Sequence, residues 1–182
     1  MALMHSKGMP VGTPAPAFSL PGVDGKTWSL SSFDDAELLV VVFTCNHCPY
    51  AIASEDRLIA IQDDYRARGV RVVAINPNDA QRYPDDSFEN MKKRAADKAF
   101  NFPYLHDESQ RVARSYDAVC TPDIFVFDRE RKLVYNGRID DNWQHPDEVT
   151  RRDLRAVLDA ALEGRIVAFE HVASMGCSIK WK

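Results

Sequence analysis

Hydrophobic and polar positions along the chain follow strand and helix patterns in turn. Residues 38–43 and 70–75 are continuous runs rich in β-branched side chains, which is typical of strands buried on both faces of a sheet. Between them Leu58, Ile61 and Tyr65 recur at helical spacing, which predicts a helix over residues 47–68, ended by Gly69. Similar patterns predict further helices over residues 84–99, 109–118 and 150–163.

Shorter alternating segments predict hairpins near both ends of the chain. Residues 18–20 and 26–30 alternate apolar with polar side chains around a Pro-Gly-Val-Asp-Gly turn, which favours an N-terminal β-hairpin. Residues 104–105, 124–127 and 132–135 are further predicted strands, and the last two flank a polar turn. Residues 165–182 receive no assignment. The order predicts one α/β domain over residues 1–182, with a mixed central sheet flanked by helices on both faces.

Composition narrows the function classes. The chain has 182 residues, of which 45% are hydrophobic, and a net charge of -4 without any basic run. A nucleic-acid partner therefore has no electrostatic support. The longest apolar run, residues 38–43, is far too short to span a bilayer, and residues 1–11 lack the apolar core of a secretory signal. We therefore expect a cytoplasmic protein with no membrane partner.

The strongest chemical signal is the Cys45-Asn46-His47-Cys48 motif. It stands where the first buried strand ends and the first long helix begins. Free N–H groups of a first helical turn stabilise a thiolate and lower the pKa of the thiol. Pro49 suits this first turn because its missing N–H costs little there. His47 adds a titratable group beside the sulfurs.

Two other interpretations of the cysteine pair stay open. The cysteines could be ordinary buried side chains, or they could belong to a zinc site. A structural zinc site needs four ligands, and no second close Cys/His pair follows. We therefore expect no bound metal, and we keep a non-enzymatic metal or partner-binding module as the alternative from another class.

With these residues, the sequence resembles the thioredoxin-fold redoxin family (AhpC/TSA type), in its peroxiredoxin-like branch with a CxxC motif. The segment 44–50, the Thr121-Pro122 pair and the Gly-Cys-Ser-Ile-Lys-Trp segment at 176–181 carry the resemblance. It implies a thioredoxin-like fold, with Pro122 as a cis-proline that faces the motif. Thr44 and Thr121 then help to shape the site.

The resemblance also implies an activity. Cys45 matches the attacking cysteine of a thioredoxin motif and Cys48 the resolving one, so we expect a thiol-disulfide oxidoreductase without a bound cofactor. Its partners would be a protein or small-molecule disulfide or thiol and an external dithiol reductant. We expect Cys45 to lie open to substrate beyond the helix end, and Cys48 to lie deeper.

Alignment with peroxiredoxins reverses these roles. Cys48-Pro49 then matches the peroxidatic Cys-Pro pair, but Cys45 stands where a Thr or Ser holds the peroxide. Pro122 stands where an activating arginine is expected. A weak thiol peroxidase that uses Cys48 is therefore the alternative function.

Cys120 and Cys177 are candidate accessory thiols. Cys120 precedes the expected cis-proline by two residues, and Cys177 lies in the unassigned tail. Either could exchange with the motif, although simple packing is the more common role of such cysteines. Trp143 and His145 could similarly border a binding groove or anchor a loop.

Overall fold

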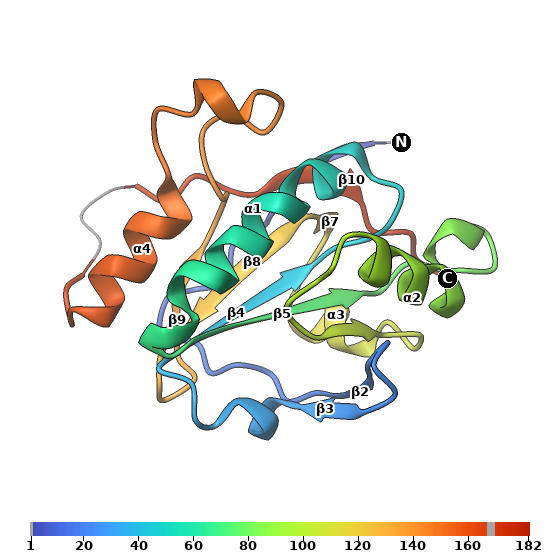
Figure 1. Cartoon of the computed structure of the whole chain (residues 1–182), viewed down its shortest axis with the longest axis horizontal. Coiled ribbons are helices and arrows are strands. Elements are labelled where there is room, and N and C mark those ends of the chain that lie inside the picture. Colours follow the sequence, from blue (N-terminus) through green and yellow to red (C-terminus); the bar gives the residue numbers. More distant parts are fainter. Residues whose placement is uncertain (1, 167–169) are drawn as a thin grey trace.

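A five-stranded sheet of order β6-β5-β4-β8-β9 forms the centre of the computed structural model, which describes residues 2–166 and 170–182 (Figure 1). Strand β4 pairs in parallel with β5 and antiparallel with β8, so the sheet is mixed, as the sequence predicts. The strands span Tyr104–His106 (β6), Val70–Asn76 (β5), Leu38–Phe43 (β4), Asp123–Phe127 (β8) and Leu133–Asn136 (β9).

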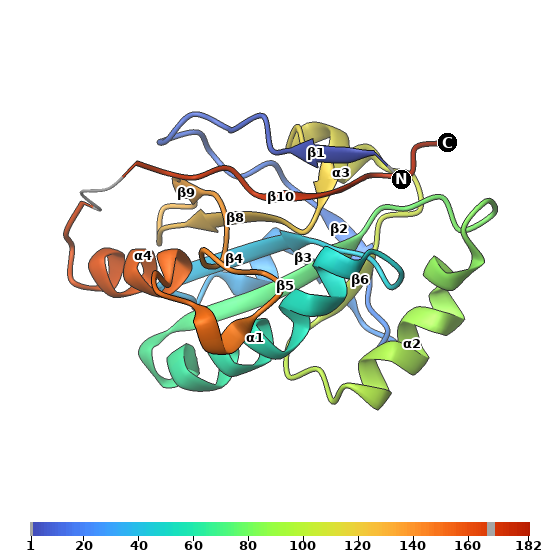
Figure 2. The ribbon, with the colours of Figure 1, turned by 90° about the horizontal axis from the view of Figure 1, so that it is seen from above.

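Helices cover both faces of this sheet (Figure 2). Alternate β4 residues point to opposite faces: Val40 and Val42 pack in the core cluster of α1, α2 and α4, whereas Leu39 and Val41 pack in the cluster of α3. This explains why the β4 sequence is apolar at every position. The helices span Pro49–Tyr65 (α1), Phe88–Asp97 (α2), Arg111–Ser115 (α3) and Asp153–Leu162 (α4).

The predicted helices are longer than the observed ones, and local backbone chemistry gives the reason. The Ser87 side chain accepts a hydrogen bond from the Asn90 N–H, so α2 begins only at Phe88. Gln110 has a φ of 62°, a left-handed conformation that prevents α3 from starting earlier. Short 3-10 turns occupy Leu30–Phe33, Arg66–Arg68, Pro84–Asp86 and Pro146–Glu148.

The predicted N-terminal hairpin is confirmed as β2 (Ser19–Pro21) and β3 (Thr27–Ser29). A three-stranded sheet, which the sequence did not predict, joins both ends of the chain in the order β1-β10-β7. It consists of β1 (Leu3–His5), β10 (Met175–Ser178) and β7 (Cys120–Thr121), and β1 and β10 lie side by side in Figure 2. The tail left unassigned thus contains a strand, while its residues 167–169 lie outside the described residues. No helix among residues 2–166 and 170–182 has both the length and the apolar character to cross a membrane.

Gly176 allows β10 to approach β7 closely. A Cβ atom at this position would lie 2.0 Å from the Thr121 carbonyl oxygen. Since that oxygen belongs to the backbone, it cannot move aside as a flexible side chain can. Cys177, the next residue, pairs with Thr121 across the two strands. The absence of a side chain at Gly176 therefore allows Cys177 to lie close to the Thr121-Pro122 segment.

We predict that Gly176→Ala lowers the free energy of unfolding by about 1–3 kcal/mol, because the added methyl group overpacks a backbone contact. Urea unfolding would measure the loss. Ser178→Ala is the control in the same strand and should cost less than about 0.5 kcal/mol. Equal stability of Gly176→Ala and the native protein would contradict the close approach of the two strands.

Candidate active site

The Cys45–Cys48 loop lies at the carboxyl ends of the parallel strands β4 and β5. Phe43 ends β4, and the Thr44 N–H donates to the Ile75 carbonyl oxygen at 2.8 Å, which prolongs the strand pairing into the loop. Helix α1 then begins with Pro49, two residues after the predicted start at residue 47, and Cys48 is its N-cap residue. Thr44 is buried and shapes the loop through this backbone bond.

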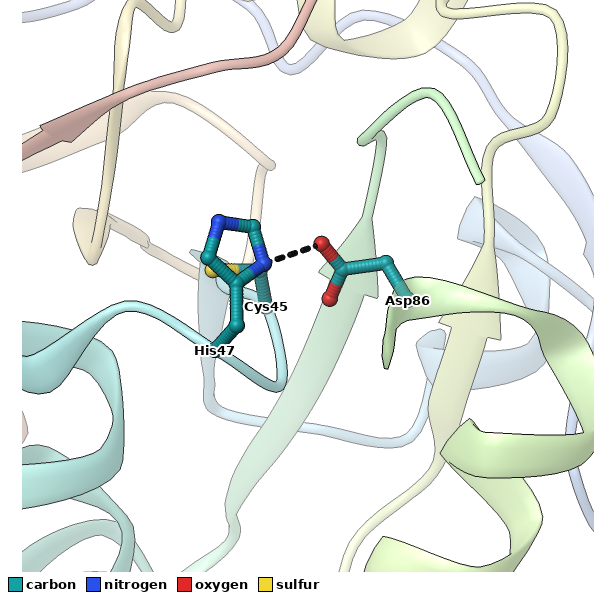
Figure 3. A group of neighbouring side chains, drawn as sticks. All are labelled: Cys45, His47 and Asp86. Carbon is teal, nitrogen blue, oxygen red and sulfur yellow. Dashed lines mark hydrogen bonds and ion pairs between the residues drawn. The ribbon is translucent and has the colours of Figure 1, made fainter. Parts of the chain in front are cut away.

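Both motif cysteines are buried. Cys45 is 2% exposed and Cys48 is 0% exposed. The expectation that Cys45 lies open to substrate is therefore wrong. Two side chains cover the Cys45 sulfur. The His47 ring lies in front of it (Figure 3), and the Thr121 side chain contacts it from the β7 side.

Thr121 contacts both sulfurs. Its Oγ1 lies 3.2 Å from the Cys45 Sγ, and its carbonyl oxygen lies 3.1 Å from the Cys48 Sγ. The peptide bond from Thr121 to Pro122 is cis, which confirms what the family resemblance implies. The β7 end and the motif therefore form one site, although 73 residues separate Cys48 from Thr121.

The surroundings of Cys48 favour its thiolate. The interaction with the Cys45 thiol contributes most to lowering the pKa of Cys48, and the Cys177 thiol lowers it further. Burial acts in the opposite direction. The Thr121 carbonyl oxygen lies 3.1 Å from the Cys48 sulfur and accepts a hydrogen bond from its neutral thiol. The two neighbouring thiols nonetheless lower the pKa of Cys48 below its usual value.

Cys45 is held as a neutral thiol. Its hydrogen bond to Cys48 raises its pKa most, followed by burial and by the negative charge of Asp86. Two anions this close together in a buried site would repel each other strongly. Cys45 therefore keeps its proton and serves as a donor to the Cys48 thiolate, the reverse of the order that the thioredoxin motif suggests.

Asp86 organises the loop around Cys45 and was not identified from the sequence, where the Pro-Asp-Asp-Ser segment indicated only a helix start. Its carboxylate is fully buried. It accepts a hydrogen bond from the Asn46 N–H at 2.7 Å. The His47 Nδ1 also donates to it at 2.7 Å (Figure 3). The amides of Asn76 and Asn78 donate at 3.1 and 2.9 Å. Asn76 ends β5 and Asn78 follows two residues later, at the edge where a parallel sheet brings the end of β5 beside the end of β4.

Cys45, His47 and Asp86 also form a group of potential metal ligands, whose ligand atoms lie within 4.8 Å of one another. Both Asp86 oxygens already accept N–H bonds, one of them from the His47 ring. A metal ion would have to displace these bonds. The arrangement is better explained as a hydrogen-bond network that holds the loop, and the sequence-based expectation of no metal stays a prediction.

The two accessory cysteines have different surroundings. Cys177 packs in one buried cluster with Cys45, Cys48 and Ala51. Cys120 instead donates a weak hydrogen bond to the Pro122 carbonyl at 3.6 Å, and burial raises its pKa well above the usual range. Cys120 therefore has the packing role that the sequence favours, whereas Cys177 belongs to the site.

An apolar cavity of about 220 Å³ lies beside the cis-proline. Tyr50 and Trp143 stand in its wall with their rings 4.0 Å apart, and Pro122 and Ile139 add apolar surface. Trp143 thus borders a cavity, one of the two alternatives raised for it. His145 is exposed and is not part of the cavity wall.

Asp123 follows the cis-proline and is a buried carboxyl group. Its Oδ1 accepts from the Asn136 side chain at 3.2 Å, while its Oδ2 has no hydrogen-bond partner in the described part of the chain. Burial raises the pKa of Asp123 to about 7. The fold therefore makes Asp123 easier to protonate than an exposed aspartate, because the neutral acid avoids a buried charge.

A thioredoxin-like fold with two cysteines at a helix start and a facing cis-proline defines a class of thiol-redox proteins. The AhpC/TSA family model matches residues 11–136. The chain therefore belongs to the AhpC/TSA family.

Two solved structures are similar over nearly their whole length. An uncharacterised conserved protein from Geobacillus kaustophilus is 47% identical, with a TM-score of 0.95, and the match covers 100% of this chain and 97% of that one. A hypothetical protein from Sinorhizobium meliloti 1021 is 42% identical, with a TM-score of 0.93 and 98% coverage of both chains.

A third structure, a proposed thiol:disulfide interchange protein DsbE from Chlorobium tepidum, is 25% identical, with a TM-score of 0.69 and coverage of 85% and 99%. Among curated proteins, none matches the chain significantly.

We predict that the thiolate absorbance of the reduced protein disappears only when the pH falls well below neutral, and that Cys48→Ser removes this absorbance. Cys45→Ala should shift the midpoint upward, because it removes the largest contribution to the lowered pKa of Cys48. An ultraviolet pH titration measures both effects, with Cys120→Ser as the control that leaves the curve unchanged. A native midpoint near the ordinary thiol value of about 8.5 would disprove the assignment.

Asp123→Asn should stabilise the protein more at high pH than at low pH. The pKa of Asp123 is about 4 in the unfolded chain and about 7 in the folded protein. The native protein therefore loses stability as the pH rises from about 4 to about 7, because folding then has to bury a charge. The neutral amide avoids this loss, so the gain should reach about 2–4 kcal/mol above neutral pH and vanish near pH 4. Urea unfolding at several pH values gives the comparison, and a gain independent of pH would show that the Asp123 charge is not its source.

Proposed function

We propose that the protein is a thiol-disulfide oxidoreductase that cycles between a Cys45/Cys48 dithiol and a Cys45–Cys48 disulfide. The observation that carries this proposal is the place of both sulfurs at the start of α1, where each contacts Thr121 next to the cis peptide bond. The lowered pKa of Cys48 supports it. A thiolate is the nucleophile of thiol-disulfide exchange. A second thiol in contact with it can complete the reaction.

The first step uses Cys48. Its thiolate attacks one sulfur of a substrate disulfide, the substrate S–S bond breaks, and the other substrate sulfur leaves with the electron pair. A mixed disulfide then joins Cys48 to the substrate. This assignment replaces the Cys45-first order that the thioredoxin motif suggests, because Cys45 is the protonated partner and is equally buried.

The second step uses Cys45. The hydrogen bond to Cys48 and the charge of Cys48 both raise the pKa of Cys45, so formation of the mixed disulfide removes both effects. Cys45 then loses its proton to the departing substrate thiolate and attacks Cys48. The Cys45–Cys48 disulfide forms, the substrate leaves fully reduced, and an external dithiol later returns the two electrons.

The surroundings favour a narrow substrate. Neither sulfur reaches the surface, so a small-molecule disulfide or an extended peptide can approach more easily than a folded protein surface. The cavity beside Pro122 offers apolar and aromatic surface for a neighbouring group of such a substrate. The Arg57 guanidinium in its wall is already bonded to Asp140 and to the Trp143 carbonyl, which favours an uncharged group there.

A weak thiol peroxidase is the second candidate, and the complete burial of the Cys48 thiolate before Pro49 favours it, since peroxide is small enough to reach a sealed sulfur. Cys48 would attack one peroxide oxygen and become a sulfenic acid, with release of hydroxide or an alkoxide. Cys45 would then displace water and form the same disulfide. We rank this activity second because Cys45 and Pro122 occupy the positions where peroxiredoxins carry peroxide-activating groups.

We predict that Cys48→Ser lowers the rate of reduction of a small aromatic disulfide at least 100-fold, since it removes the thiolate that starts the cycle. The measurement is single-turnover reduction by the pre-reduced protein, with peptide mapping of the oxidised product. The native protein should yield the Cys45–Cys48 disulfide. Cys120→Ser is the matched control and should retain the native rate.

Three outcomes decide between the candidates. A trapped mixed disulfide on Cys45 in Cys48→Ser, together with loss of reaction in Cys45→Ser, would restore the Cys45-first order. Faster consumption of hydrogen peroxide than of the disulfide under the same conditions would make peroxidase the better assignment. Retention of both free motif thiols after turnover would exclude the proposed cycle.

A further inference from the structure

Strand β10 brings a third thiol to the reactive pair. Cys177 lies opposite Thr121 in the antiparallel pairing of β10 with β7. Thr121 is also the residue whose side chain and carbonyl group contact Cys45 and Cys48. Cys177 therefore stands across the same backbone segment as both reactive sulfurs.

The contact between Cys177 and Cys48 is direct. Cys177 is 4% exposed and packs with Cys45, Cys48 and Ala51 in a buried cluster. The charge of Cys48 reaches the Cys177 thiol and raises its pKa. The Cys48 sulfur thus has two thiol neighbours, one from its own loop and one from the opposite end of the chain.

We propose that Cys177 is an exchange thiol of this site, which converts the Cys45–Cys48 disulfide into a Cys48–Cys177 disulfide. This inference rests on the proposed function for the origin of the first disulfide. In the exchange, the Cys177 sulfur attacks the Cys48 sulfur, and the Cys45–Cys48 bond breaks. Cys45 leaves with the electron pair and takes the proton that Cys177 gives up. One disulfide replaces another, so no further oxidant or reductant is needed.

Oxidation of Cys48 prepares Cys177 for this step. In the reduced protein, burial raises the pKa of Cys177 most, and the hydrogen bond to Cys48 and the charge of Cys48 raise it further. The two contributions from Cys48 vanish once that sulfur is part of a disulfide. The nearby positive charge of Lys180, which lowers the pKa of Cys177, remains. Cys177 is thus a better nucleophile once Cys48 is part of a disulfide than it is in the reduced protein.

The exchange has two structural consequences. Cys45 becomes a free thiol again beside Thr121 and His47, so the oxidised protein can offer a second reactive sulfur. At the same time, a covalent bond ties β10 to the start of α1, two elements otherwise held by packing. Gly176, the neighbour of Cys177, allows the close approach of β10 to β7 that brings this thiol to the site.

The test uses Cys45→Ser, in which Cys48 has only Cys177 as a thiol neighbour in its cluster. We expect glutathione disulfide to convert this variant into an intrachain Cys48–Cys177 disulfide, identified by peptide mapping under non-reducing conditions. Cys45→Ser/Cys177→Ser should instead stop at a glutathione adduct on Cys48. Cys45→Ser/Cys120→Ser is the matched control and should behave like Cys45→Ser.

The native protein distinguishes this inference from the proposed function. A native Cys45–Cys48 disulfide together with a persistent glutathione adduct in folded Cys45→Ser would overturn the role of Cys177 and leave the dithiol cycle intact. In the native protein we expect the Cys45–Cys48 disulfide to form first and the Cys48–Cys177 disulfide to appear at its expense. A native Cys48–Cys177 disulfide that forms from the outset, with no earlier Cys45–Cys48 bond, would overturn the proposed cycle and support the Cys48–Cys177 pair. Circular dichroism of each variant verifies that it is folded.

Discussion

An anion buried at the first turn of a helix needs hydrogen-bond donors, because water no longer solvates it. In this protein the Cys45 and Cys177 thiols lower the pKa of the Cys48 sulfur and so favour its thiolate. They come from the motif loop and the C-terminal strand. The site therefore depends on bringing these two segments together at one sulfur atom.

Asp86 acts on the other motif cysteine, Cys45. A buried carboxylate stabilises the loop through four N–H donors, and its charge opposes a thiolate at Cys45. The same residue thus orders the loop and directs the negative charge to Cys48. Positioning and electrostatics are coupled here, because the site is closed to solvent and charges act on one another with little screening.

The cis-proline segment connects the redox site to the rest of the fold. Thr121 contacts both sulfurs, Cys177 pairs opposite it, and Asp123 continues into β8 of the central sheet. A change in the thiols can therefore reach the C-terminal strand through one short backbone segment. For this reason the C-terminal segment, which carries little recognisable sequence pattern, forms part of the candidate active site.

The sequence by itself determined the buried strands, the place of Pro49 in the first turn of a helix and the place of the CxxC motif, because these depend on local patterns: continuous β-branched runs, and a proline that fits a first helical turn. Only the tertiary structure decided which sulfur carries the charge. That choice depends on Asp86, Cys177 and Thr121, which lie far from the motif in the chain and reach it through strand pairing and loop packing. Burial and the charges of neighbours set a pKa, and neither can be derived from residue spacing when the neighbours come from distant segments.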